Sequence, residues 1–105
     1  MDRSENFFEN ITEEELVKLN VLSSQIQFLI AESFKHRDPS SVIAQRAVSL
    51  HRDWIELVYG DYDEDFHREL AIKYSKENMD SQEEGEFFKE AIFIYIHNNK
   101  ELERD

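Results

Sequence analysis

Apolar residues recur at intervals of three or four positions along most of the chain, which is the spacing of one face of an α-helix. The first such segment follows Thr12 and is expected to end near Lys35 or His36. Its apolar positions are Leu16, Leu19, Leu22, Ile26, Leu29, Ile30 and Phe34. Thr12 and Glu15 have the spacing of a capping box, in which each side chain accepts a hydrogen bond from a backbone N–H at the helix start. The pattern therefore predicts a first long helix that begins directly after Thr12.

A second helix is predicted between Asp38 and Gly60. Asp38 is expected to cap it, with Pro39 at the first helical position, where a missing N–H costs nothing. Gly60 is expected to end it, because glycine tolerates the left-handed conformation of a helix C-terminus. Its expected apolar face comprises Ile43, Ala47, Leu50, Trp54, Leu57 and Val58.

Two further helices are predicted in the second half of the chain. Asp61 or Asp63 is expected to cap the third. The fourth should begin at Asp80 and Ser81 and end before the polar pair at residues 98 and 99. The inward positions of these helices are expected to be Phe66, Leu70, Ala71, Tyr74, Phe87, Phe88, Ala91, Ile92, Ile94 and Tyr95.

The chain is expected to fold as one all-α domain. It has 105 residues with only two glycines and one proline, so it offers little material for hairpins or long loops. We expect four helices, with a possible fifth short turn near residues 60–65. The predicted organisation is a lead-in at residues 1–10, a helical ligand-binding domain at 11–99 and a tail at 100–105.

Composition excludes several function classes. The formal net charge is −12, from 24 acidic and 12 basic side chains. Proteins that bind nucleic acid neutralise phosphates with lysine and arginine, so neither nucleic acid nor an anionic membrane is an expected partner. The chain has no cysteine, and no apolar run approaches the length of a membrane span. We expect a cytoplasmic protein that is a monomer or a weak homodimer.

No residue pattern typical of catalysis or metal binding is complete. Asp61, Asp63 and Asp65 match the first ligands of a calcium-binding EF-hand loop, but Phe66 and Ile72 occupy the positions that need glycine and glutamate. The four histidines lack the spacing of a zinc-binding pair on one helix. Single glycines form no phosphate loop. The sequence therefore predicts no enzyme, no cofactor and no metal.

Aromatic residues gather around the predicted junction of the second and third helices. They are Trp54, Tyr59, Tyr62, Phe66 and Tyr74, and His51 and His67 fall near them on the same helices. Aromatic walls with a few polar groups are typical of ligand pockets. The pattern alone favours an ordinary core for these residues and leaves a ligand pocket as the alternative interpretation.

Five stretches of the chain resemble the TipAS family of antibiotic-recognition domains. They are Phe-Glu-Asn-Ile-Thr-Glu-Glu at residues 8–14, Asp-Pro-Ser-Ser at 38–41, His-Arg-Asp-Trp-Ile at 51–55, the series Phe66, Leu70 and Tyr74, and Glu-Ala-Ile at 90–92 followed by Tyr95. Their order and spacing, more than any single motif, carry the resemblance, which spans residues 8–97. TipAS domains are effector modules of thiostrepton-induced, MerR-type transcriptional regulators.

The resemblance implies a compact, globin-like fold without haem, and a cleft for bulky hydrophobic antibiotics such as thiopeptides. In the family, ligand capture controls transcription through an attached DNA-binding domain, or sequesters the drug as a resistance mechanism. The expected ligand-binding residues are His51, Trp54, Tyr59, Tyr62, Phe66 and Tyr74. Tyr62 lies near the position of a cysteine that traps the antibiotic in some members, so binding here is expected to be non-covalent. The alternative function is an acidic helical module for protein–protein interaction.

Overall fold

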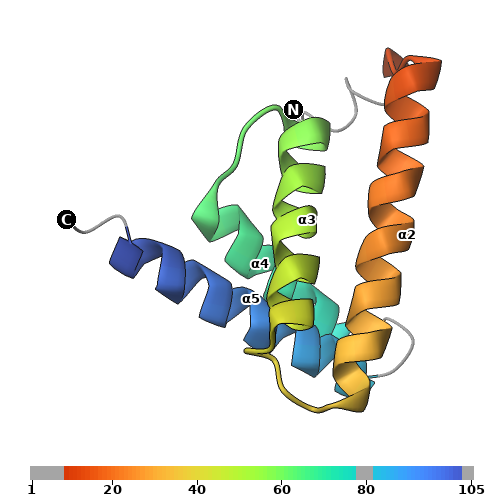
Figure 1. Cartoon of the computed structure of the whole chain (residues 1–105). Coiled ribbons are helices and arrows are strands. Elements are labelled where there is room, and N and C mark those ends of the chain that lie inside the picture. The colour runs from red at the N-terminus through yellow and green to blue at the C-terminus, as the bar shows by residue number, and fades with distance from the viewer. Residues whose placement is uncertain (1–8, 78–81, 103–105) are drawn as a thin grey trace.

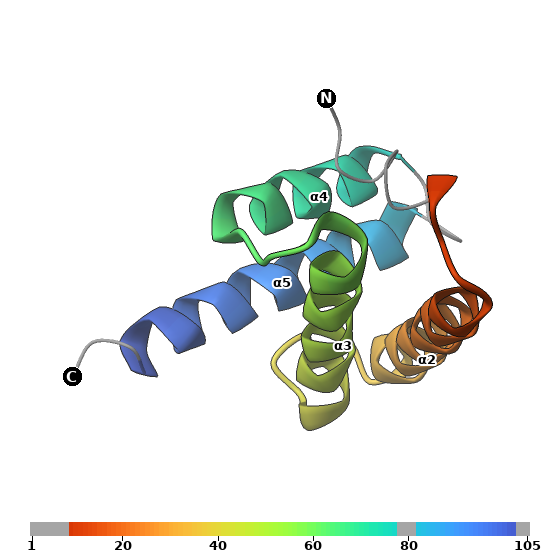
Figure 2. The ribbon, with the colours of Figure 1, turned by 90° about the horizontal axis from the view of Figure 1, so that it is seen from above.

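The computed structural model describes residues 9–77 and 82–102, which form four α-helices and no strand. The helices are α2 (Glu13–Lys35), α3 (Val42–Tyr59), α4 (Glu64–Lys76) and α5 (Gln82–Leu102). They form two antiparallel pairs, α2 with α3 and α4 with α5 (Figure 1). Figure 2 shows that the second pair lies across the first. The prediction of an all-α fold of four to five helices is confirmed.

Three helix boundaries are confirmed where the sequence carries a capping residue. The Glu15 backbone N–H donates to Thr12 Oγ1 at 3.1 Å, and the Thr12 N–H donates to Glu15 Oε1 at 3.2 Å, which completes the capping box. Gly60 ends α3 with a φ of 93°, in the left-handed region. Asp63 caps α4 by accepting from the Asp65 N–H at 2.9 Å.

The predicted start of the second helix is wrong. Ser41 is the cap of α3, and its hydroxyl accepts from the Ala44 N–H at 3.2 Å. The Asp38 carboxylate instead accepts from the Ser40 N–H at 3.0 Å and from the Ser40 hydroxyl at 2.6 Å, so it stabilises the preceding turn.

The predicted end of the last helix is also wrong, since α5 continues past Asn98 and Asn99 to Leu102. The expected cap at Asp80 and Ser81 lies outside the described residues. So do residues 1–8 of the predicted lead-in and residues 103–105 of the predicted tail.

The core lies where the two helix pairs cross. Its members are Ile26, Ile30, Ala44, Ala47, Val48, Ala71, Phe87, Phe88, Ala91, Ile92 and Ile96. On α3 the buried face is rotated from the predicted one, because Ile55 is wholly buried and Ile43 is 38% exposed. Small residues at Ala44 and Ala47 allow this face to approach its neighbours closely. Trp54 consequently lies at the edge of the core instead of at its centre.

One face of α2 presents apolar side chains to solvent. Val17, Val21 and Phe28 are 62%, 50% and 64% exposed, respectively. They project from the side of α2 opposite its buried residues, which include Ile26 and Ile30. Within the described ranges, no helix has the length and apolar character that crossing a membrane requires.

Candidate functional site

A cavity of about 190 Å³ lies where all four helices meet. Its lining residues are Ser23, Ile26 and Gln27 from α2, His51 and Trp54 from α3, Tyr74 from α4, and Phe88 from α5. We call it the aromatic cavity. Every described helix contributes to it, so its shape depends on the crossing of the two helix pairs.

Stacked rings form the walls of the aromatic cavity. The His51 and Trp54 rings are nearly parallel, with 5.6 Å between centroids and 9° between planes. Tyr74 and Phe88 also stack, at 5.9 Å and 17°. The Phe88 ring meets His51 edge to face at 5.2 Å. These contacts hold the rings in fixed orientations, so the walls of the cavity are largely aromatic.

A line of three hydrogen bonds runs from the loop before α4 to the cavity wall. Tyr62 Oη lies 2.8 Å from His67 Nδ1, His67 Nε2 lies 2.9 Å from His51 Nδ1, and His51 Nε2 lies 3.1 Å from Tyr74 Oη. We call this series the hydrogen-bond chain. Both histidines are buried, His67 completely. Each of their ring nitrogens therefore has a partner inside the protein.

All four members of the hydrogen-bond chain are uncharged at neutral pH. Burial, followed by the nearby His67, lowers the pKa of His51 to about 3. Burial, followed by the Arg52 cation, lowers the pKa of His67 to about 4. Burial raises the pKa of Tyr62 and of Tyr74 to about 12. The site therefore offers a ligand neutral hydrogen-bonding groups among aromatic surfaces.

Comparison with protein families identifies this architecture. The model of the TipAS antibiotic-recognition domain matches residues 1–95. The chain belongs to the TipAS family. The comparison with curated proteins found no match, and neither did the comparison with solved structures.

Five of the six expected ligand-binding residues of this TipAS domain fall into two groups. His51, Trp54 and Tyr74 line the aromatic cavity directly. Tyr59 and Phe66 meet edge to face at 4.7 Å, and Tyr59 lies 6.2 Å from Trp54, so this pair continues the aromatic surface beyond the cavity.

Tyr62 is placed differently from the other expected residues. It is half-buried at the far end of the hydrogen-bond chain and does not line the aromatic cavity. It reaches the cavity only through His67 and His51.

Sequence reasoning missed other residues that line the aromatic cavity. Phe88 was expected only as a core residue, and the polar Ser23 and Gln27 of α2 carried no recognisable pattern. His67 was noted near the aromatic cluster, and the structure makes it the central link of the hydrogen-bond chain. Its position three residues before Leu70 on an amphipathic helix was the available indication that it faces inward.

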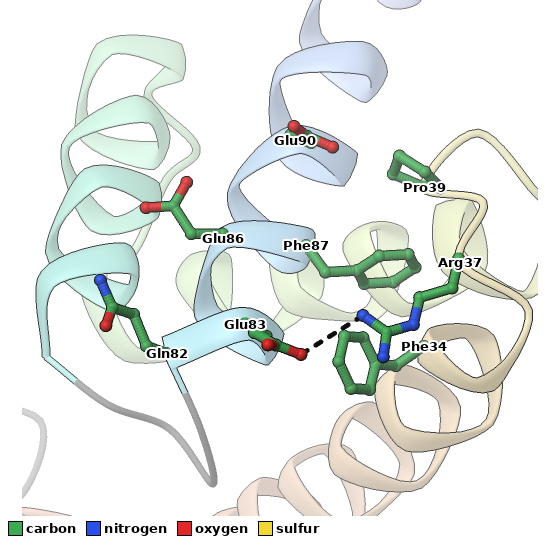
Figure 3. A pocket seen from close by; sticks show the side chains of 8 residues that line it. All are labelled: Phe34, Arg37, Pro39, Gln82, Glu83, Glu86, Phe87 and Glu90. Atoms are coloured by element: carbon green, nitrogen blue, oxygen red, sulfur yellow. Dashed lines mark hydrogen bonds and ion pairs between the residues drawn. The ribbon is translucent and has the colours of Figure 1, made fainter.

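A larger cavity, of about 430 Å³, lies between the end of α2 and the start of α5. Figure 3 shows its floor of Phe34 and Phe87 and its acidic rim. Arg37 covers this floor, with its guanidinium carbon 4.3 Å from the Phe34 ring centroid and an ion pair to Glu83 at 3.4 Å. The chain's own charged groups thus occupy much of the aromatic surface. The smaller aromatic cavity is the better candidate for an apolar ligand, because neither an acidic nor a basic side chain lines it.

Proposed function

We propose that this chain binds a bulky, hydrophobic, ring-rich antibiotic such as a thiopeptide without forming a covalent bond. The observation that carries the proposal is the aromatic cavity, with stacked rings as walls and few polar groups. An apolar cavity of about 150 Å³ suffices to hold benzene in another protein. A cavity of about 190 Å³ therefore accommodates one ring of a large antibiotic and not the whole molecule.

The remainder of the ligand would lie on the aromatic surface outside the cavity. Trp54, Tyr59 and Phe66 form a continuous series of ring contacts that leads away from it. Burying ~400 Å² of apolar surface on these rings contributes on the order of 10 kcal/mol before the entropic cost of association. A domain of this size can thus reach micromolar affinity.

We further propose that binding leads to sensing or sequestration of the drug in the cytoplasm, and not to catalysis. The described residues contain no group of three potential metal ligands. The net charge of −12 disfavours direct contact with DNA, so any transcriptional response requires a DNA-binding chain or domain that cooperates with this one. The protein acts as a monomer or a weak homodimer in this proposal.

Replacing Trp54 with alanine should weaken thiopeptide binding at least tenfold, because it removes one wall of the aromatic cavity. Isothermal titration calorimetry with thiostrepton measures the affinity of both proteins. Trp54→Phe preserves a flat ring and should retain most of the affinity. The change to alanine should also lower the stability, by about 3 kcal/mol, so circular dichroism must first show that the variant is folded.

Phe28→Ala provides a matched control on the exposed face of α2. It also removes an aromatic side chain, but from a surface outside the aromatic cavity. Thiostrepton affinity should be unchanged. If Phe28→Ala abolished binding while Trp54→Ala did not, the ligand would occupy the α2 surface and the proposed site would be wrong.

The exposed apolar face of α2 also supports a second candidate function. Val17, Val21 and Phe28, on a chain with a charge of −12, would suit an acidic helical module that contacts another protein. Absence of drug binding from every protein tested, the wild type included, would favour this function over the first.

Thiopeptide bound to this chain should be released intact on denaturation. The chain contains no cysteine, and burial raises the pKa of Tyr62 to about 12, so almost no phenolate is available as a nucleophile. Intact-protein mass spectrometry after incubation with thiostrepton should show the mass of the unmodified chain. A stable adduct under denaturing conditions would contradict the non-covalent mechanism.

A further inference from the structure

The hydrogen-bond chain can adopt only two arrangements of its hydrogens. A neutral imidazole has one N–H donor and one nitrogen acceptor, so the direction of one hydrogen bond fixes the direction of the next. The donors point either from Tyr62 through His67 and His51 to Tyr74, or in the reverse order. Both arrangements satisfy all the ring nitrogens of the two buried histidines.

The two arrangements present different groups to the aromatic cavity. In the forward arrangement, Tyr74 Oη accepts from the His51 Nε2–H and its own hydrogen is left to donate to a ligand. In the reverse arrangement, Tyr74 donates that hydrogen to His51 and offers only lone pairs. Tyr74 and His51 both line the cavity, so the direction of the hydrogen-bond chain determines what the ligand meets.

Arg52 favours the forward arrangement. Its guanidinium carbon lies 4.2 Å from the Tyr62 ring centroid. When every hydrogen points toward Tyr74, the negative end of the chain's dipole lies at Tyr62, next to this cation. Arg52 itself pairs with the more exposed Glu56 at 3.3 Å, which offsets part of its charge. The other charged groups that influence Tyr62 are Glu64 and Arg68, which pair with each other at 3.9 Å and largely offset.

We infer that the aromatic cavity selects a ligand ring that carries a hydrogen-bond acceptor, such as a ring nitrogen or a carbonyl oxygen. Tyr74 contacts the acceptor. Arg52 and Tyr62 lie outside the cavity and are positioning residues, because they act through His67 and His51. This inference rests on the proposed function of the aromatic cavity as a ligand site, and it adds the chemistry that the site prefers.

Two small probes of the same two-ring shape test this preference. Benzothiazole carries a ring nitrogen acceptor, and indene carries none. In NMR titrations of the full chain, benzothiazole should bind about fivefold more tightly, which is the worth of one neutral hydrogen bond. Tyr74→Phe removes the donor and should bring the ratio of the two affinities to about one. The ratio is the deciding quantity, because both probes meet the same altered wall.

A charge series at position 52 tests the role of Arg52. Arg52→Lys should keep the preference for benzothiazole, Arg52→Gln should reduce it, and Arg52→Glu should remove it by favouring the reverse arrangement. The Arg52 side chain is 35% exposed and does not line the cavity, so indene affinity should not change along the series. Arg46→Gln makes the same charge change at an exposed position of α3 and should leave the ratio unaltered.

The possible outcomes separate this inference from the proposed function. If indene binds in the cavity but the wild-type protein binds benzothiazole no more tightly than indene, the inference is wrong and the aromatic cavity remains a ligand site. The same holds if Arg52→Glu leaves the ratio of the two affinities unchanged. If neither probe shifts the resonances of Trp54 and Phe88, the cavity is not a ligand site and the proposed function itself fails.

Discussion

Replacing Gly85 with alanine should destabilise the protein by about 3 kcal/mol. Gly85 lies on α5 where that helix meets α4, and a Cβ there would overlap the carbonyl oxygen of Tyr74. It would also lie 3.2 Å from the Tyr74 carbonyl carbon and 3.3 Å from Ser75 Cα. All three are backbone atoms, so no side-chain rotation relieves the overlap and the two helices must separate. Urea denaturation followed by circular dichroism measures the loss.

Whether Gly85→Ala lowers or raises the stability distinguishes the effect of packing from that of helix propensity. Alanine is ordinarily favoured over glycine inside a helix by about 1 kcal/mol. Glu86, the exposed neighbour of Gly85, provides the control: Glu86→Ala should be more stable than Glu86→Gly. If Gly85→Ala were also stabilising, α4 and α5 could not be in contact at this point. Separation of the helices would also shift Tyr74, so ligand affinity should fall together with stability.

Acidification from pH 7 to pH 5 should lower the free energy of unfolding by up to about 4 kcal/mol through His51 and His67 alone. Their folded-state pKa values are about 3 and about 4, below the ordinary value of 6.5. Above pH 6.5 both histidines are neutral whether the chain is folded or unfolded, and their full stability is present. Below pH 6.5 the unfolded chain binds protons that the folded chain excludes, so stability falls by up to about 1.4 kcal/mol per pH unit for each histidine.

Urea titrations at pH 7, 6 and 5 measure this dependence. His67→Gln keeps a donor and an acceptor in the buried position but cannot titrate, so the fall in stability should be about half as steep. His36→Gln removes an exposed histidine at the end of α2, and the steep fall should persist. A wild-type protein equally stable at pH 7 and pH 5 would show that the two histidines are not held neutral in the folded state.

At alkaline pH the stability should depend on Tyr62 and Tyr74, the other two members of the hydrogen-bond chain. Burial raises the pKa of Tyr62 and of Tyr74 from 10.0 to about 12. Above about pH 10 the unfolded chain loses phenolic protons that the folded chain retains, so stability should decrease again. The four residues together give a stability plateau between about pH 6.5 and pH 10.

Helix positions were predictable where the necessary contacts lie within one turn. The capping box of Thr12 and Glu15, the glycine at position 60 and the aspartate cap at position 63 each involve atoms at most four residues apart. At Asp38 the same reasoning failed, because two local arrangements competed. The Asp38 carboxylate bonds within the turn at Ser40, and Ser41 takes the capping position.

The buried face of α3 was only partly predictable. The sequence pattern predicted that the large residues Leu50, Trp54 and Leu57 face inward, but the fold leaves all three half-buried. The fold buries Ala47, as predicted, but it also buries Ala44 and Val48, which were not predicted, because these small residues allow the α4–α5 pair to approach closely across the crossing. Which of two adjacent faces is buried depends on the partner helices, and periodicity within one helix does not contain that information.

The sequence by itself determined the helical class, most of the helix ends, the family and the presence of an aromatic cluster, since all of these follow from local spacing and residue type. Only the tertiary structure decided which aromatic residues face the aromatic cavity. It joined His51 to His67 across 16 positions of sequence and to Tyr74 across 23. It also brought Gly85 of α5 against the backbone of Tyr74. Hydrogen bonds and steric contacts act over a few ångströms, so they form only after the crossing of the two helix pairs has placed these residues side by side.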